Sequence, residues 1–142
     1  MKIQSKEITT DRAQVEMSLP SGVINGSSID MSLKITNQGN ASLQIMESGY
    51  FTYCNIVCRE QSGTIVPHTD LGREYFSEAG DGGQCAFVEI KPQESKSWSF
   101  DLTRVVELEV GDYQFEIAVD LEEADLQDHT RLTVSDLTFS VI

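Results

Sequence analysis

Apolar and polar residues alternate in short runs along most of this 142-residue chain, and this alternation limits the fold more than any other feature. The clearest run is 29–36, where Ile, Met, Leu and Ile at odd positions alternate with Asp, Ser, Lys and Thr at even positions. Successive side chains of a β-strand point to opposite faces, so a period of two predicts a strand with one buried face. Shorter runs of the same kind occur at 15–19, 43–45, 86–90, 98–102, 113–119, 132–134 and 137–141.

The spacing of these runs predicts the architecture. Turn residues separate them, among them Ser21-Gly22, Asn37-Gln38-Gly39-Asn40 and Pro92-Gln93-Glu94, and we found no long amphipathic helix. About seven to nine short strands separated by turns are typical of an immunoglobulin-like antiparallel β-sandwich, which is the predicted all-β fold. We expect the runs 29–36 and 43–45 to form a hairpin across the Asn-Gly turn.

Domain boundaries follow from the same pattern. Residues 1–11 are polar without a period and predict a mobile N-terminal arm or a short edge segment, and residues 12–142 predict a single β-sandwich domain. At 103–108 the apolar period lengthens towards three, which predicts a short helical turn bridging the two sheets. The inward positions change from even to odd at Ser135-Asp136, which predicts a β-bulge.

The stretch from Ile90 to Val119 organises the predicted core. It contains the alternating rows that begin at Trp98 and Tyr113, which we expect to face each other from the two sheets. The order Gly111-Asp112-Tyr113 resembles the tyrosine corner of immunoglobulin-like sandwiches, in which the phenol bonds to the backbone just upstream of its own strand. An ordinary hairpin with a buried tyrosine is the alternative.

The formal net charge of −13 is unevenly distributed. Residues 1–71 carry five Lys/Arg against seven Asp/Glu, and residues 72–142 carry five against sixteen, so the halves carry −2 and −11. An acidic surface repels phosphate groups, which argues against nucleic acids and anionic membranes as partners. No apolar run is long enough to span a bilayer, and the first seven residues do not read as a signal peptide. We therefore expect a cytoplasmic protein if the chain is full length.

The three cysteines leave at least one thiol unpaired. Cys54 and Cys58 lie four residues apart in a predicted strand, about 13 Å from each other, which is too far for a mutual disulfide or a shared zinc ion. Only Cys85 remains as a partner for either of them.

Four segments resemble a β-sandwich module found beside deuterolysin-type metallopeptidases and in bacterial envelope proteins. Residues 63–72 read Gly-Thr-Ile-Val-Pro-His-Thr-Asp-Leu-Gly, residues 92–95 read Pro-Gln-Glu-Ser, residues 100–104 read Phe-Asp-Leu-Thr-Arg, and residues 111–113 read Gly-Asp-Tyr. The resemblance covers roughly residues 27–142. The resemblance implies a bacterial accessory module that is secreted or envelope-associated. A secreted module would have lost a signal peptide.

The chain departs from that pattern at two positions, where Gln93 replaces a customary glycine and Thr103 a customary serine; neither change threatens the fold. No His-Glu-x-x-His sequence occurs, so the peptidase activity of such neighbours is not implied. A looser resemblance to the bacterial intracellular proteinase inhibitor makes inhibition of a peptidase an alternative function.

Few residues suit catalysis. The chain has two histidines, His68 and His129, with no Gly-x-Ser-x-Gly elbow, which argues against a serine hydrolase. We therefore expect a non-enzymatic protein without a cofactor.

Calcium is the metal that this sequence suits best, because calcium accepts several oxygen ligands from flexible loops. The candidate ligands lie in the acidic segment between the last two strand runs and are Asp120, Glu122, Glu123, Asp125 and Asp128. This segment lacks the Asp-x-Asp-x-Asp-Gly spacing of a dedicated calcium loop, so solvated surface charge is the competing interpretation.

The long connection at 68–84 is the predicted contact surface for a protein partner. It holds an aromatic pair, Tyr75 and Phe76, next to Arg73, and four glycines. The opposing interpretation is that both rings cover the open end of the sandwich. The sequence thus predicts an adhesion-type protein-interaction module whose partner and oligomeric state are open, with the inhibitor and the calcium-dependent module as alternatives.

Overall fold

The computed structural model describes residues 3–48, 51–52, 54–71, 85–123 and 129–142. For residues 46–48, 51–52, 54–55, 85–87, 120, 123 and 129–130 it describes the backbone only.

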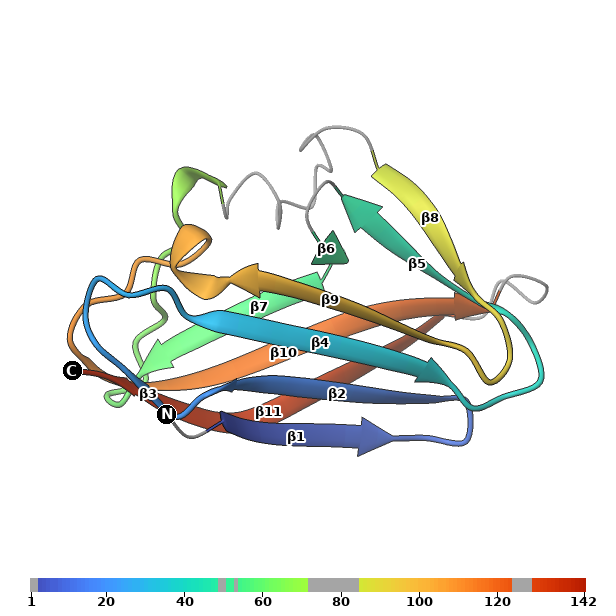
Figure 1. The fold of residues 1–142 in the computed structure, drawn as a ribbon, viewed down its shortest axis with the longest axis horizontal. Helices are drawn as coiled ribbons and strands as arrows, with labels where there is room; N and C mark the ends of the chain where they lie inside the picture. The colour runs from blue at the N-terminus through green and yellow to red at the C-terminus, as the bar shows by residue number, and fades with distance from the viewer. Residues whose placement is uncertain (1–2, 49–50, 53, 72–84, 124–128) are drawn as a thin grey trace.

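Eleven strands in these residues form two sheets (Figure 1). The four-stranded sheet has the order β1-β2-β4-β9 and consists of β1 (Ile3–Thr9), β2 (Ala13–Pro20), β4 (Asp30–Asn37) and β9 (Ser95–Asp101). The seven-stranded sheet consists of β3 (Gly22–Val23), β5 (Leu43–Ser48), β6 (Phe51–Thr52), β7 (Cys54–Glu60), β8 (Cys85–Ile90), β10 (Gly111–Glu123) and β11 (His129–Val141). Its order is β3-β11-β10-β5-β6, with β7 also paired to β10 and β8 to β5. All pairs are antiparallel except β3 with β11.

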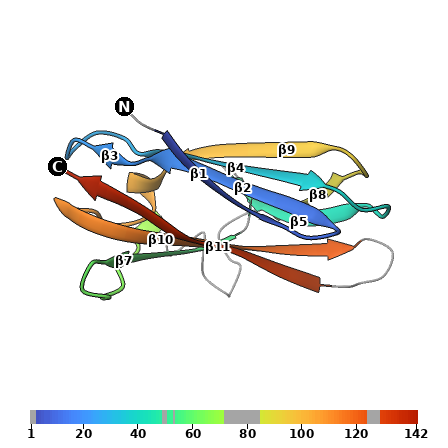
Figure 2. The same ribbon diagram turned by 90° about the horizontal axis from the view of Figure 1, so that it is seen from below.

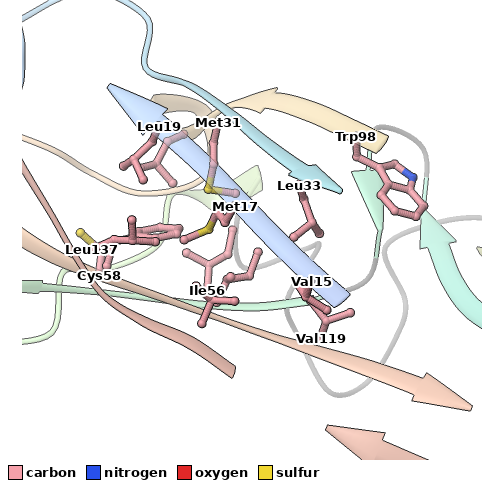
Figure 3. Packing of buried hydrophobic residues seen from close by; sticks show 14 of the residues in the cluster. Val15, Met17, Leu19, Met31, Leu33, Ile56, Cys58, Trp98, Val119 and Leu137 are labelled. Atoms are coloured by element: carbon pink, nitrogen blue, oxygen red, sulfur yellow. The ribbon is translucent and has the colours of Figure 1, made fainter. Parts of the chain in front are cut away.

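The two sheets lie one above the other (Figure 2) and bury the alternating residues between them. Figure 3 shows Met17 and Leu33 of the smaller sheet pointing towards Ile56 and Val119 of the larger one. Trp98 and Tyr113 are both buried and come from opposite sheets, as predicted. The all-β sandwich fold is therefore confirmed. It has more strands than expected, because strands of only two residues, such as β3 and β6, are too short to show an alternating pattern.

Two local predictions are also confirmed. The register of β10 with β11 shifts between Phe115 and Ile117, whose partners are Leu137 and Val134, so β11 carries one extra residue at the predicted bulge. Asp136 adopts a positive φ of 65° there. The helical turn between the sheets is a 3-10 helix, η1 (Leu102–Arg104), which begins one residue before the predicted segment and spans three residues.

The predicted hairpin between 29–36 and 43–45 is wrong. Strand β4 lies in the four-stranded sheet between β2 and β9, whereas β5 lies in the seven-stranded sheet beside β10 and β8. Where the chain leaves β4 for the other sheet, Asn37 occupies an inward position and is fully buried. Its side-chain nitrogen donates to the carbonyl oxygens of Ala41 and Ile90, both at 2.8 Å, and its side-chain oxygen accepts from Gly39 N at 3.0 Å.

Residues 3–9, within the segment predicted as an arm or edge segment, form the edge strand β1. It pairs with β2 along its whole length, from Ile3 opposite Pro20 to Thr9 opposite Gln14. The side chain of Gln4 donates from Nε2 to the carbonyl oxygen of Thr138 in β11. This edge of the smaller sheet is thus tied to the larger sheet. No helix in the described part of the chain is long and apolar enough to cross a membrane.

The turn before β9 carries a left-handed residue that is not glycine. Gln93 has φ 72°, and Glu94 N donates to Lys91 O at 3.0 Å. Proline followed by a positive φ is the pattern of a type II turn, which favours glycine at its third position.

We expect Gln93→Gly to raise the free energy of unfolding by about 0.5–1 kcal/mol, because relief of left-handed strain exceeds the added entropy of the unfolded chain. Urea denaturation of the variant measures this change. Gln93→Ala is the matched control and is expected to give no gain, since alanine has the same Cβ. Equal effects of glycine and alanine would contradict the strain argument.

Candidate binding surface at the terminal end

The site residues predicted from the sequence lie mostly outside the described part of the chain. Arg73, Tyr75 and Phe76 fall in 72–84, so their partner-binding role stays a prediction. Of the five candidate calcium ligands, Glu122 alone has a described side chain, and it is exposed at the end of β10. Asp120 and Glu123 are placed by their backbone in β10, and Asp125 and Asp128 fall in 124–128.

The described titratable groups do not gather into a metal site. Within the described ranges, no group of three or more His, Cys, Asp and Glu side chains lies close enough to hold an ion. His68 is half-buried, and its Nε2 lies 3.1 Å from the carbonyl oxygen of Ile56 in β7. Because a carbonyl oxygen only accepts, Nε2 carries the proton and donates. His68 therefore helps to close the outer edge of β7.

Cys58 carries a free thiol in the core, 1% exposed. Burial raises its pKa from 9.0 to about 12. The side chains of Cys54 and Cys85 lie outside the described residues.

Because the thiolate is the reactive form, Cys58 is expected to resist iodoacetamide in the folded protein at about pH 8 and to react fully in urea. Mass spectrometry of the peptide containing Cys58 distinguishes the two states. Rapid labelling without denaturant would contradict the burial of this thiol.

The exposed apolar side chains gather at one end of the sandwich. Strand β1 begins and β11 ends there (Figure 1), and we call it the terminal end. The connecting segments 24–29, 61–68 and 102–110 meet at this end, where Leu102 N donates to Ile29 O and Glu107 N to Pro67 O. Within the described residues the large apolar side chains that are exposed are Ile3, Ile24, Ile65, Val110 and Ile142.

Three of these residues occupy neighbouring positions, and we call them the apolar row: Ile24, Ile142 and Val110. Their exposed fractions are 72%, 75% and 63%. Asn25 N donates to Ile142 O, and Ile142 N donates to Val23 O, both at 2.8 Å, which places Ile24 beside Ile142. Val110 precedes Gly111, which pairs with Val141. The row thus lies just beyond the paired ends of β3, β11 and β10.

The tyrosine corner fixes the loop that carries Val110. The hydroxyl of Tyr113 donates to Glu109 O at 2.7 Å and accepts from Glu109 N at 3.0 Å. The ring of Tyr113 stacks on Phe139 of β11, with centroids 5.4 Å apart. The predicted corner is therefore confirmed, and it anchors the backbone one residue before Val110.

A small pocket opens at the same end, and we call it the end pocket. Its volume is about 230 Å³. It is lined by Val23, Ile24, Asn25, Gly26, Ser27, Ile29, Thr103, Leu108 and Val141. Residues from the 20–30 turn, η1 and β11 therefore meet around one hollow beside the apolar row.

Asp101 holds one wall of the end pocket. Its Oδ1 accepts from Thr103 N at 3.0 Å, Thr103 Oγ1 at 2.7 Å and Ile29 N at 3.0 Å. Partial burial acts to raise the pKa of Asp101, but the hydrogen bonds from Thr103 and Ile29, with the charge of Arg104, outweigh it. The pKa of this carboxyl is therefore below its ordinary value.

Because the folded pKa is depressed, the stabilising effect of Asp101 is present above the ordinary pKa and disappears as the pH falls through the folded value. We expect Asp101→Asn to lower the free energy of unfolding by about 0.5–1 kcal/mol near neutral pH, since a charged acceptor forms the stronger bonds. The gap between the urea midpoints of the two proteins should narrow as the pH falls from about 7 to about 3. A constant gap at every pH would contradict the role of the charge.

The sequence contained a weak sign of the apolar row. Ile24 and Val110 are large apolar residues inside predicted turns, where they break the polar character of the loop. The longer connections at 68–84 and 120–129 carry the stronger signals of length and charge in the sequence. Apolar residues in a turn also fold inwards in this protein, as Val66 does with 4% exposure.

Comparisons with known proteins bear on the fold. No protein-family model matches the sequence, and no curated protein matches it. Among solved structures, the C-terminal domain of Wzt is similar with a TM-score of 0.58 and 13% identity, over 98% of this chain and 78% of that one. At this identity the likeness shows a shared β-sandwich fold and no more.

Two further similarities are more distant. A β-glucosidase from Listeria innocua in complex with gluconolactone has a TM-score of 0.42 and 10% identity, over 94% of this chain and 16% of that one. The GAE domain of GGA2p from Saccharomyces cerevisiae has a TM-score of 0.36 and 6% identity, over 94% of this chain and 97% of that one.

Proposed function

We propose that this chain is a non-catalytic, immunoglobulin-like accessory module that binds a protein partner through the apolar row at its terminal end. The observation that carries the proposal is the neighbouring placement of Ile24, Ile142 and Val110, each more than 60% exposed. Single exposed apolar residues are ordinary on protein surfaces, but neighbouring ones mark sites of interaction.

The surroundings of the row indicate the chemistry of the partner. Val110 lies between the exposed carboxylates of Glu109 and Asp112, in a chain of net charge −13. A complementary surface would present aliphatic side chains with Lys or Arg at the rim. The tyrosine corner holds this part of the loop in place before binding, which lowers the entropy lost on association.

The resemblance to modules beside deuterolysin-type metallopeptidases and in bacterial envelope proteins supports an accessory role. The tyrosine of its Gly-x-Tyr segment forms the corner, and its Pro-x-Glu-Ser segment forms the turn before β9. A secreted or envelope location would follow from this resemblance and is part of the proposal.

A comparison of variants on immobilised protein tests the proposal. A partner should be retained from a lysate of the source organism by the native chain and lost by Ile24→Ser combined with Val110→Ser. Ile65→Ser is the matched control, because Ile65 is 58% exposed but lies outside the row. It should retain the same partner.

A second arm tests the loop predicted from the sequence, with Tyr75→Ala combined with Phe76→Ala. Loss of the partner in this arm alone would assign binding to the 68–84 connection and overturn the assignment to the row. Hydrolytic turnover abolished by a single histidine or cysteine change would overturn the non-catalytic role.

A further inference from the structure

A second hollow at the terminal end differs in chemistry from the apolar row, and we call it the polar cleft. Its volume is about 350 Å³, at the lower end of the range of small-molecule sites. It is lined by Gln4, Ser21, Gln61, Asp112, Tyr113, Gln114, Thr138, Phe139 and Ser140. Tyr113 and Phe139 are largely buried in the core, so most of the accessible side chains are amides, hydroxyls and one carboxylate.

Neighbouring strands supply the floor of the cleft. Asp112 pairs with Ser140, and Gln114 pairs with Thr138, so these four side chains share the outer face of β10 and β11. Antiparallel neighbours lie about 4.5–5.5 Å apart, which is within reach of adjacent hydroxyl groups on one small ligand. The floor is therefore a regular array of polar groups.

Hydrogen bonds fix the frame of the cleft. Ser140 Oγ donates to Asp112 Oδ1 at 2.5 Å, and the backbone nitrogen of Gln61 donates to Asp112 O at 3.2 Å. Gln4 donates from its side chain to Thr138 O and so holds β1 against the other wall. These contacts use one oxygen of the Asp112 carboxylate and the side-chain nitrogen of Gln4. Among the described residues, they leave the second carboxylate oxygen of Asp112 and the amide oxygen of Gln4 to a ligand.

Two amides in the cleft add unused hydrogen-bonding capacity. The side chains of Gln61 and Gln114 have no hydrogen-bond partner among the described residues, and Gln114 is exposed, as is Gln61. Each amide offers two donor hydrogens and an acceptor oxygen. The amides of Gln61 and Gln114 and the carboxylate of Asp112 thus offer hydrogen-bond donors and acceptors next to one another in the cleft.

The lining decides which class of ligand fits. It contains no Lys, Arg or His to bind an anion, and more of its accessible surface is polar than apolar. Sugar hydroxyls both donate and accept, as do the amides and hydroxyls of the cleft, and a carboxylate oxygen accepts from a sugar hydroxyl as a charge-assisted bond. We propose that the polar cleft binds a neutral saccharide unit through Asp112, Gln114, Thr138 and the amides of Gln4 and Gln61.

This site goes beyond the protein-binding role, because its side chains differ from those of the apolar row. Nuclear magnetic resonance of the ¹⁵N-labelled chain tests it, since glutamine side-chain amides give their own signals. The probes are glucose, galactose, mannose, N-acetylglucosamine, maltose, cellobiose and lactose, with triglycine and inorganic phosphate as controls. The amide signals of Gln61 and Gln114 should shift and saturate at millimolar concentrations with at least one saccharide.

Gln114→Leu combined with Thr138→Val should weaken that binding at least tenfold. Asp112→Asn is a second variant that keeps the shape of the side chain and should also weaken binding. Thr133→Val is the matched control, because Thr133 is an exposed residue of β11 outside the cleft, and it should bind as the native chain does.

The saccharide site would be overturned if no saccharide shifts these signals, or if the cleft variants bind as tightly as the Thr133→Val control. Equal binding of triglycine or phosphate would also overturn it. Ile24→Ser with Val110→Ser should leave saccharide binding unchanged, which separates this site from the partner surface.

Discussion

Replacing Asn37 with leucine is expected to lower the free energy of unfolding by about 2–4 kcal/mol, although leucine has nearly the same size and is apolar. The Asn37 side chain is fully buried and bonds to Ala41 O, Ile90 O and Gly39 N. Leucine would leave these groups without their partner in the interior, and an unsatisfied buried polar group costs more than the bond contributes. Urea denaturation followed by Trp98 fluorescence measures the loss.

Asn37→Asp distinguishes lost hydrogen bonds from lost packing. Its carboxylate would face two carbonyl oxygens in the core, so its folded pKa should be raised, and the destabilisation should grow as the pH rises above about 4. Gln38→Leu is the control, because Gln38 is exposed next to Asn37. Its change should stay within about 0.5 kcal/mol. An Asn37→Leu protein as stable as this control would contradict the role of Asn37 at the crossover.

Tyr113→Phe is expected to lower the free energy of unfolding by about 1–2 kcal/mol, because it removes both hydrogen bonds of the tyrosine corner and retains the ring. The stacking of the ring on Phe139 should persist, so the loss reports on the hydroxyl group. Amide hydrogen exchange at Glu109 should accelerate, since its N–H now donates to the Tyr113 oxygen. Urea denaturation gives the stability change.

Glu109→Ala is the matched control for the corner. The Tyr113 hydroxyl bonds to the backbone of residue 109, so the truncated side chain should leave the corner and the stability almost unchanged. A loss in Glu109→Ala as large as that in Tyr113→Phe would mean that the exposed carboxylate stabilises the loop, and the stability change could then not be attributed to the corner hydrogen bonds.

The proposed partner surface depends on this corner. Val110 directly follows Glu109, whose backbone is held by the corner. Loss of these hydrogen bonds would increase the backbone mobility of both residues. We therefore expect Tyr113→Phe to weaken partner binding as well as stability, although its side chain is buried beneath the surface. The corner thus connects the core of the sandwich to the surface that is proposed to bind.

Alternation by itself determined the fold class and much of the local detail. The runs at 15–19 and 29–36 predicted strands, and the change of inward positions at Ser135-Asp136 predicted the bulge, because a strand has a fixed period of two. The order Gly111-Asp112-Tyr113 predicted the corner, because its bond is local, between residues four apart. Such features depend on residues close together in the chain, so they can be predicted from the sequence.

Only the tertiary structure decided which strands share a sheet and which turn residues stay exposed. Asn37 reads as a turn residue, but it lies in the inward row of β4 and bonds to Ile90 of the other sheet, 53 residues away. Val66 and Ile65 are adjacent apolar loop residues, yet one is 4% and the other 58% exposed. Burial of a loop residue depends on segments distant in sequence. A periodic pattern distinguishes only the two faces of a single strand and does not show which segments pack against them. The apolar row lies beyond the ends of three strands and the polar cleft is lined by several segments, so both follow from those distant contacts.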